Sequence, residues 1–158
     1  MKCGIGQDSH RFDGAAKPLV LGGVAFPGEP GLEGNSDADV VLHALCNAIS
    51  GATGHNVLGA EADRMLRDHG ESDSEAYVRA ALGGLAGYAV THVSIAIECS
   101  RPRIAPRADE MRANIARIVG VGPGSVGITA TSGEGLTAFG QGLGVQAICI
   151  VTCAPKPP

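Results

Sequence analysis

The feature that most constrains the fold is the alternation along the chain of β-branched extended segments with segments of helical period, separated by glycine and proline. The extended segments are predicted over residues 2–9, 19–26, 90–99, 125–131 and 144–153. The helices are predicted from a cap at Ser36 to about residue 51, over residues 74–85, and from Pro106 to about residue 119. This alternation favours an α/β (α+β) fold, in which a single mixed sheet carries the helices on one face.

The length of 158 residues fits one domain. We expect that domain to cover residues 1–154 and the proline-rich residues 155–158 to form a flexible tail. Hydrophobic residues make up 44% of the chain but aromatic residues only 3%, so the core must be built from Val, Ile, Leu and Ala.

Charge and cysteine content exclude several classes of protein. The formal net charge is −4 and no basic stripe is present, which argues against a nucleic-acid partner. The five cysteines lie in apolar stretches without a C-x-x-C pair, which is typical of unpaired thiols in a reducing compartment. No secretion signal is recognised and the longest apolar run, residues 145–151, is too short for a membrane span. We therefore expect a cytoplasmic protein with no membrane partner.

Two separate segments carry candidate metal ligands. Asp8 and His10 are two apart on a predicted strand and project to the same face. His43 lies on the first predicted helix, with Asn47 one turn later and placed to orient its imidazole. Two histidines and one carboxylate suit Zn²⁺ with one open coordination position. Taken alone, the Asp-x-His pair is better explained as a surface turn, and His43 as a core histidine.

Two further segments could hold phosphate. The glycine-rich stretch 129–144 has hydroxyls, free backbone amides and a lone acid, Glu134, that could bind Mg²⁺ through oxygen. A glycine-rich hairpin with a solvated Glu134 explains the same stretch equally well. Arg101, Arg103 and Arg107 precede the third predicted helix and suit a phosphate or nucleotide. For Arg107 a solvated basic turn is the better interpretation.

These segments occur in the same order and at similar spacing as in a known family. The chain resembles the 2-C-methyl-D-erythritol 2,4-cyclodiphosphate synthase family over nearly its whole length. The segments that carry the resemblance are residues 4–12, 19–23, 36–40, 43–45, 106–112 and 129–144. The resemblance implies a β-α-β-α-β-β type core and a homotrimer whose sheets surround a central axis, with active sites at the subunit boundaries.

The resemblance also implies the roles of individual residues. Asp8, His10 and His43 would bind Zn²⁺ or another divalent transition metal, and Glu134 would bind Mg²⁺ or Mn²⁺ on the nucleotide diphosphate. Asn35 and Ser132 would act on the transition state. The full set of implied substrate-binding residues is Asp8, Ser9, His10, Asn35, Ser36, Asp39, Gly59, Cys99, Ser100, Arg101, Pro102, Arg103, Ile104, Ala105, Ala130, Thr131, Ser132 and Glu134.

Several positions depart from the family pattern. Asn35 stands where the family usually has His, Val57 where it has Asp, Arg103 where it has Lys, and Gln141 where it has Arg. In the altered region 55–71, Asp63 is the remaining candidate for a substrate contact.

The implied activity is that of a phosphorus–oxygen lyase of isoprenoid precursor synthesis. It converts 4-diphosphocytidyl-2-C-methyl-D-erythritol 2-phosphate, a small cytidine diphosphate substrate, into 2-C-methyl-D-erythritol 2,4-cyclodiphosphate and CMP. Two alternatives remain at this point: a zinc-dependent phosphohydrolase that uses the same three ligands, and a non-catalytic trimeric anion-binding module.

Overall fold

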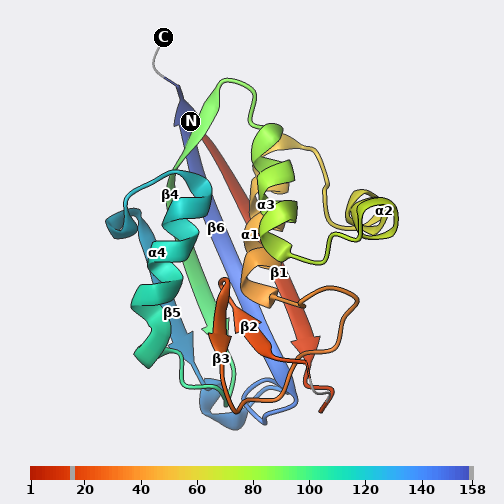
Figure 1. Cartoon of the computed structure of the whole chain (residues 1–158). Helices are drawn as coiled ribbons and strands as arrows, with labels where there is room; N and C mark the ends of the chain where they lie inside the picture. The colour runs from red at the N-terminus through yellow and green to blue at the C-terminus, as the bar shows by residue number, and fades with distance from the viewer. Residues whose placement is uncertain (15–16, 157–158) are drawn as a thin grey trace.

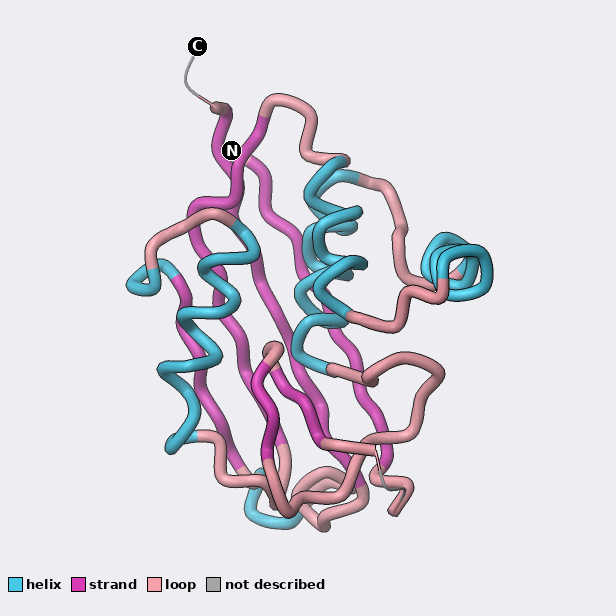
Figure 2. The backbone as a smooth tube through the Cα atoms, viewed as in Figure 1, coloured by secondary structure: helices cyan, strands magenta, loops and turns pink. Residues whose placement is uncertain are grey.

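A four-stranded mixed sheet is the centre of the fold (Figures 1 and 2). The computed structural model describes residues 1–14 and 17–156. The sheet has the order β1-β6-β4-β5, in which β6 runs antiparallel to both of its neighbours and β4 runs parallel to β5. Its strands are β1 Lys2–Arg11, β4 Tyr88–Glu98, β5 Val126–Thr131 and β6 Gly144–Pro155. The predicted mixed α/β class is therefore confirmed.

Three helices cover one face of this sheet (Figure 1). They are α1 Val40–Thr53, α3 Ser74–Gly83 and α4 Ala108–Val119. The α1 residues from Val40 to Ser50 are buried except for the half-buried Asn47, because α1 packs against β1, β6 and α3. A helix that is apolar on nearly all sides is one that other elements enclose.

Two glycines of β1 allow α1 to lie directly on the strand. A Cβ atom added at Gly4 would lie 2.0 Å from the Ala48 carbonyl oxygen, and one added at Gly6 would lie 2.2 Å from that of Ala44. Any side chain here would push the helix away. Because side chains alternate along a strand, Asp8 and His10 project to this same covered face.

The predicted extended segment 19–26 is a hairpin rather than one strand. It consists of β2 Leu19–Leu21 and β3 Val24–Phe26, which form a separate two-stranded sheet. Gly22 and Gly23 have φ values of 61° and 75°. A two-residue hairpin turn with positive φ at both positions favours glycine, which explains why the chain reverses here.

Other predicted boundaries also need correction. Helix α2, Ala60–His69, was not expected; its apolar stripe is short, formed by Ala62, Met65 and Leu66, and Ala62 is its one buried residue. The N-cap of α1 is Asp39 rather than Ser36. At the C-terminus, β6 extends to Pro155 and the Lys156 amide donates to the Gly87 carbonyl, so the predicted tail begins later than residue 155. Residues 157–158 of that tail lie outside the described residues.

The core lies between the sheet and the helices and is aliphatic, as the composition predicts. Its largest fully buried side chains include Leu42, Leu45, Ile49, Ile95 and Ile115. Over the residues that the structure describes, no helix combines the length and apolar character that a membrane crossing requires.

Candidate metal centre and nucleotide pocket

Asp8, His10 and His43 meet at one end of β1. His10 Nε2 lies 2.9 Å and His43 Nδ1 lies 3.0 Å from the same atom, Asp8 Oδ2. The two imidazole rings are 5.6 Å apart between centroids. The three side chains offer ligand atoms that all lie within 4.8 Å of one another. The first turn of α1 therefore brings its histidine onto the strand-end pair, which the spacing alone did not predict and the resemblance implied.

The two imidazoles control the charge of this cluster. Burial alone would raise the pKa of Asp8, but the two imidazoles of His10 and His43, each within 3.0 Å of its Oδ2, outweigh burial and lower this pKa to about 2. The Asp8 carboxylate in turn raises the pKa of His10, against the effect of burial. Asp8 is thus an anion throughout the physiological range.

The donor set fits a transition-metal ion. His10 Nε2 is buried and has no partner in hydrogen-bonding geometry among the described residues, although it lies close to Asp8 Oδ2. Two ring nitrogens and one carboxylate oxygen that converge in this way are what a catalytic Zn²⁺ site provides, with the fourth position left to substrate. The residues present therefore fit the metal that the resemblance implies.

A pocket of about 420 Å³ opens beside the three ligands. Asn35 and Ser36 line it from the loop before α1, and Gly59 and Asp63 line it from the α2 region. The rest of its wall comes from Gly34, Asn47, Leu58, Ala62, Leu66 and Tyr77. The unexpected helix α2 thus forms one side of the pocket.

Asp39, one of the residues predicted to touch substrate, is not accessible to it. Its side chain is fully buried. Oδ1 accepts from the amides of Gly22, Val41 and Leu42 at 2.9–3.1 Å, and Oδ2 accepts from Gly23 at 2.6 Å. Burial raises the pKa of Asp39 to about 6, although these amides oppose the shift. Its carboxylate joins the hairpin to α1 and has no surface left for a ligand.

A second pocket, of about 500 Å³, lies where β4 and β5 end. The two strands are parallel neighbours, so the segments that follow them emerge at the same edge. Together these segments line the pocket with Cys99, Ser100, Pro102, Arg103, Ile104, Ala105, Pro106, Ala130, Thr131 and Ser132. The structure thus brings together the two segments that the resemblance assigns to cytidine. Arg101 does not line this pocket, because its Nε donates to Glu29 at 2.7 Å.

Ser9 and Glu134, both predicted to touch substrate, lie away from the Asp8, His10 and His43 cluster within one chain. Ser9 projects to the opposite face of β1 from Asp8 and His10, as strand alternation requires, and lines a smaller pocket with Phe139 and Leu143. Glu134 is exposed on the 3₁₀ turn Gly133–Gly135, outside the three-ligand cluster.

The partner of the His43 ring was not the one expected. Asn47 Nδ2 donates to the Gln7 carbonyl rather than orienting the imidazole. His43 Nε2 instead lies 2.8 Å from Ser74 Oγ at the start of α3. The sequence gives no signal for this contact, since a serine at a helix start is ordinarily a capping residue.

Comparison with known proteins agrees with this geometry. Residues 1–154 match the model of the YgbB family. The curated 2-C-methyl-D-erythritol 2,4-cyclodiphosphate synthase of Chlamydia muridarum is 50% identical over 154 residues, which are 96% of this chain and 86% of that protein. The corresponding synthase of Chlamydia trachomatis is 49% identical over the same shares of both chains.

Solved structures give the same answer. The bifunctional IspDF of Campylobacter jejuni matches with a TM-score of 0.89 and 26% identity, over 98% of this chain and 42% of that longer one. A CDP-bound 2C-methyl-D-erythritol-2,4-cyclodiphosphate synthase matches with a TM-score of 0.84 and 29% identity, over 97% of this chain and 100% of that one. The chain therefore belongs to the YgbB family, whose members named here are 2-C-methyl-D-erythritol 2,4-cyclodiphosphate synthases.

Proposed function

We propose that this chain is a phosphorus–oxygen lyase that converts 4-diphosphocytidyl-2-C-methyl-D-erythritol 2-phosphate into 2-C-methyl-D-erythritol 2,4-cyclodiphosphate and CMP. The observation that carries the proposal is the convergence of Asp8, His10 and His43 on one point, beside an open pocket. Full-length relatives of about 49% identity that carry this name support it.

The nucleophile in this reaction is the substrate's own 2-phosphate, which attacks the β-phosphorus. The second pKa of a phosphate monoester is about 6, so this group is ionised at neutral pH without a protein base. The protein's task is to fold one flexible, highly charged molecule onto itself. Holding reacting groups in attack geometry can lower a barrier by as much as about 7–11 kcal/mol.

Each group of residues has a part in that task. Asp8, His10 and His43 would hold Zn²⁺ or a similar transition metal, and Glu134 would hold Mg²⁺ or Mn²⁺. When bound, these cations would neutralise the diphosphate and polarise its phosphoryl oxygens. Asn35 would donate a hydrogen bond from its amide and Ser132 from its hydroxyl to oxygens that gain charge in the transition state.

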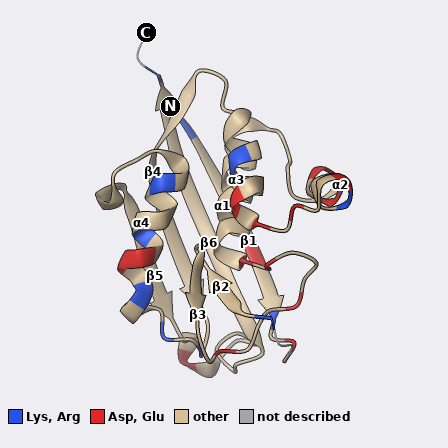
Figure 3. Ribbon diagram, viewed as in Figure 1, with Lys and Arg blue, Asp and Glu red and all other residues tan. Residues whose placement is uncertain are grey.

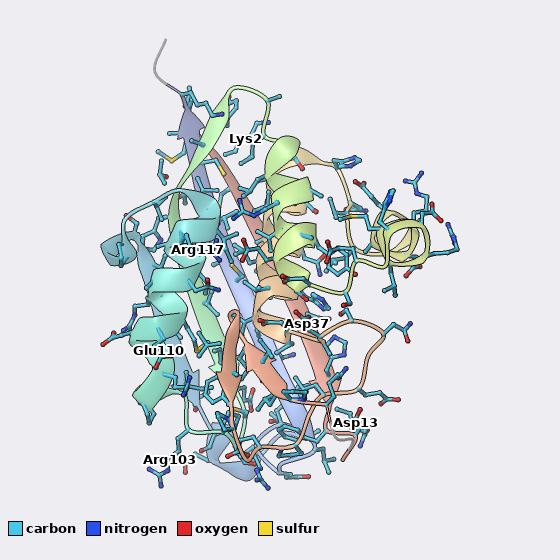
Figure 4. All side chains as sticks on the ribbon, viewed as in Figure 1. Lys2, Asp13, Asp37, Arg103, Glu110 and Arg117 are labelled. Atoms are coloured by element: carbon cyan, nitrogen blue, oxygen red, sulfur yellow. The ribbon has the colours of Figure 1, made fainter. Side chains whose placement is uncertain are left out.

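The pocket at the ends of β4 and β5 would bind the cytidine half of the substrate. Most of its lining residues have small side chains, which suit a flat base, and Arg103 among them supplies a positive charge. Figure 4 shows the Arg103 side chain extending outward from the lower end of the molecule. Asp63, Gly59 and Ser36 would contact the erythritol half in the metal-side pocket.

We further propose a homotrimer in which the two half-sites meet between neighbouring chains. The pockets share no lining residue, and β1 and β5 are opposite edges of the sheet (Figure 1). Three strand spacings of ~4.8 Å separate those edges, roughly 14 Å in all. Ile5, Ile148 and Ile150 are exposed on the sheet face opposite to the helices. Packing of that face around a common axis would cover them and join the β5 edge of one chain to the β1 edge of the next.

The expected setting is the cytoplasm. All five cysteines are free, four of them buried and Cys3 exposed. Thiols in this state are typical of a reducing compartment.

The test is to incubate the purified protein with the diphosphocytidyl substrate, Zn²⁺ and Mg²⁺, and to follow the products by phosphorus NMR. Equal amounts of CMP and the cyclic diphosphate are expected, without inorganic phosphate. Release of inorganic phosphate would show a phosphohydrolase instead. Binding of CMP without turnover would show a non-catalytic module.

A further inference from the structure

Ser74 is a fully buried hydroxyl that reaches the metal centre from a helix which contributes no ligand. Its Oγ lies 2.8 Å from His43 Nε2, the ring nitrogen that faces away from Asp8. On its other side, Ser74 Oγ–H donates to a carboxylate oxygen of Asp37. Asp37 also accepts the Ser74 amide at 3.0 Å.

The direction of these hydrogen bonds follows from the chemistry of the three groups. A carboxylate can only accept, and a serine hydroxyl has one proton to donate. If Ser74 Oγ–H is used on Asp37, its lone pair is left for His43, and His43 Nε2 must be the donor. The ring then carries a proton on Nε2. Nδ1, which lies 3.0 Å from Asp8 Oδ2, is therefore the nitrogen that must release its proton to offer a lone pair to a metal ion.

We propose that Ser74 and Asp37 are positioning residues that fix the orientation and tautomer of His43 for metal binding. This inference rests on the metal centre of the proposed function. A hydrogen bond on the far nitrogen raises the basicity of a ligating imidazole and holds its ring in place. Because Ser74 and His43 are both buried, water does not compete for these bonds.

The same contacts hold the substrate-side loop. The Asp37 amide donates to the Ser72 carbonyl at 3.0 Å, so the loop before α1 is tied to the start of α3. Figure 4 places Asp37 beside the first turn of α1. Ser36 and Asn35 lie one and two residues earlier, and both line the metal-side pocket. The contacts of Ser74 and Asp37 thus hold both the His43 ring and the loop that forms the adjoining wall of the pocket.

The decisive variant is Ser74→Ala, and the decisive measurement is the Zn²⁺ dissociation constant from competition with a chromophoric chelator. We expect binding to weaken about 10–100-fold, the range found when groups behind a metal ligand are removed. Ser74→Thr keeps the hydroxyl and should retain most of the affinity.

A matched control separates positioning from loosening of the helix. Asp73→Ala removes the N-cap of α3, whose carboxylate accepts the Glu75 amide at 2.8 Å, but Asp73 makes no contact with the imidazole. Its Zn²⁺ affinity should remain that of the wild type. Equal losses in Asp73→Ala and Ser74→Ala, or a folded Ser74→Ala protein with wild-type affinity, would overturn the inference.

Nitrogen-15 NMR of labelled histidine tests the proton position directly. His43 Nε2 should carry a slowly exchanging proton with or without zinc, and the slow exchange should be lost in Ser74→Ala. An unprotonated Nε2 in the wild-type protein would disprove the positioning by Ser74 and Asp37 even if zinc binds. A wild-type protein that keeps the Nε2 proton but binds no zinc would instead refute the metal centre, while the hydrogen bonds of Ser74 to His43 and Asp37 would still be supported.

Discussion

Asp8 Oδ2 is the atom on which the electrostatics of the metal centre depend. Two imidazole nitrogens lie within 3.0 Å of it. Together the imidazoles hold the pKa of the Asp8 carboxyl near 2, in spite of burial that acts in the other direction. A metal ion that entered the site would therefore meet a carboxylate that is already ionised, and would have to displace protons only from the histidines.

The first prediction at this scale concerns His43. Replacing it by Ala leaves two ligands and should abolish both stoichiometric zinc retention and turnover, which metal analysis and the CMP assay would measure. His55→Ala is the matched control, because His55 is exposed and pairs with the half-buried Glu61 at 2.9 Å, outside the cluster. A zinc-free His43→Ala protein with full activity would refute the site.

The second concerns Glu134, which has a φ of 52° on its turn and an exposed side chain. Glu134→Gln keeps the shape but removes the charge, so the Mg²⁺ concentration for half-maximal activity should rise about tenfold, equivalent to ~1.4 kcal/mol. Zinc content should not change, since Glu134 lies outside the three-ligand cluster. An unaltered Mg²⁺ titration would count against this role.

At the scale of elements, the Asp39 carboxylate connects the β2–β3 hairpin to α1 through hydrogen bonds to amides of both. In Asp39→Asn, the side-chain NH2 group would replace one of the two oxygens. It would then face either the N–H of Gly23 or the N–H groups of Gly22, Val41 and Leu42, and two donors would meet. We expect the free energy of unfolding at pH 7 to fall by about 2 kcal/mol, because a buried donor loses its acceptor. Urea denaturation would measure the loss. Asp73→Asn, at an exposed cap with one amide contact, should cost less; equal losses would contradict the argument.

Glu75 links α3 to α4. It accepts from Arg79 on its own helix and from Arg117 on α4, and hydrogen bonds from Arg117 and then Arg79 lower its pKa from 4.5 to about 2, against burial. The stabilisation is therefore present above pH 4.5 and is lost as the pH falls towards 2. For such a solvated pair we expect Glu75→Gln to cost at most about 1 kcal/mol at pH 7.

The check for Glu75 is the unfolding free energy of both proteins across this pH range. The difference between wild type and Glu75→Gln should shrink as the pH falls through the interval between the two pKa values. If the difference in unfolding free energy between wild type and Glu75→Gln stays constant down to about pH 2, the effect of the substitution is not electrostatic.

At the scale of the whole molecule, the charged residues gather on the helices and loops, whereas the sheet is largely free of them (Figure 3). Ile5 lies opposite Ile150 on neighbouring strands, and both are exposed, at 67% and 42%. Burying one isoleucine side chain fully is worth about 1.5–3 kcal/mol, so an uncovered row of them favours association. This is the surface on which the proposed trimer would form.

The prediction for this surface is that Ile148→Lys gives a monomer in sedimentation velocity and loses activity, because each active site would need two chains. Ala113→Lys places the same charge on the exposed side of α4 and should leave both the assembly and the activity unchanged. A trimeric Ile148→Lys protein would show that another surface holds the chains together.

Most helices and strands could be predicted from periodicity, because an apolar stripe fixes which face of an element is buried. The strand over residues 144–153 and the helix from Ser74 both begin where predicted. Helix α2 was missed because most of its residues are exposed and its apolar stripe is short, although acids in its first turn and bases in its last turn are a helix signal. The hairpin at residues 19–26 was missed although Gly22-Gly23 is a turn signal.

The sequence by itself determined that Asp8 and His10 share one face of a strand, and its resemblance to a known family singled out His43 as their companion. Read without that resemblance, it did not show that His43 reaches them. Only the tertiary structure decided how the buried polar groups are used. Asp39 connects the hairpin to α1 instead of touching substrate, and Ser74, not Asn47, is the partner of the His43 imidazole. The physical reason is that a buried hydrogen-bonding group takes whichever partner the packing brings within reach, and packing joins residues that lie far apart along the chain.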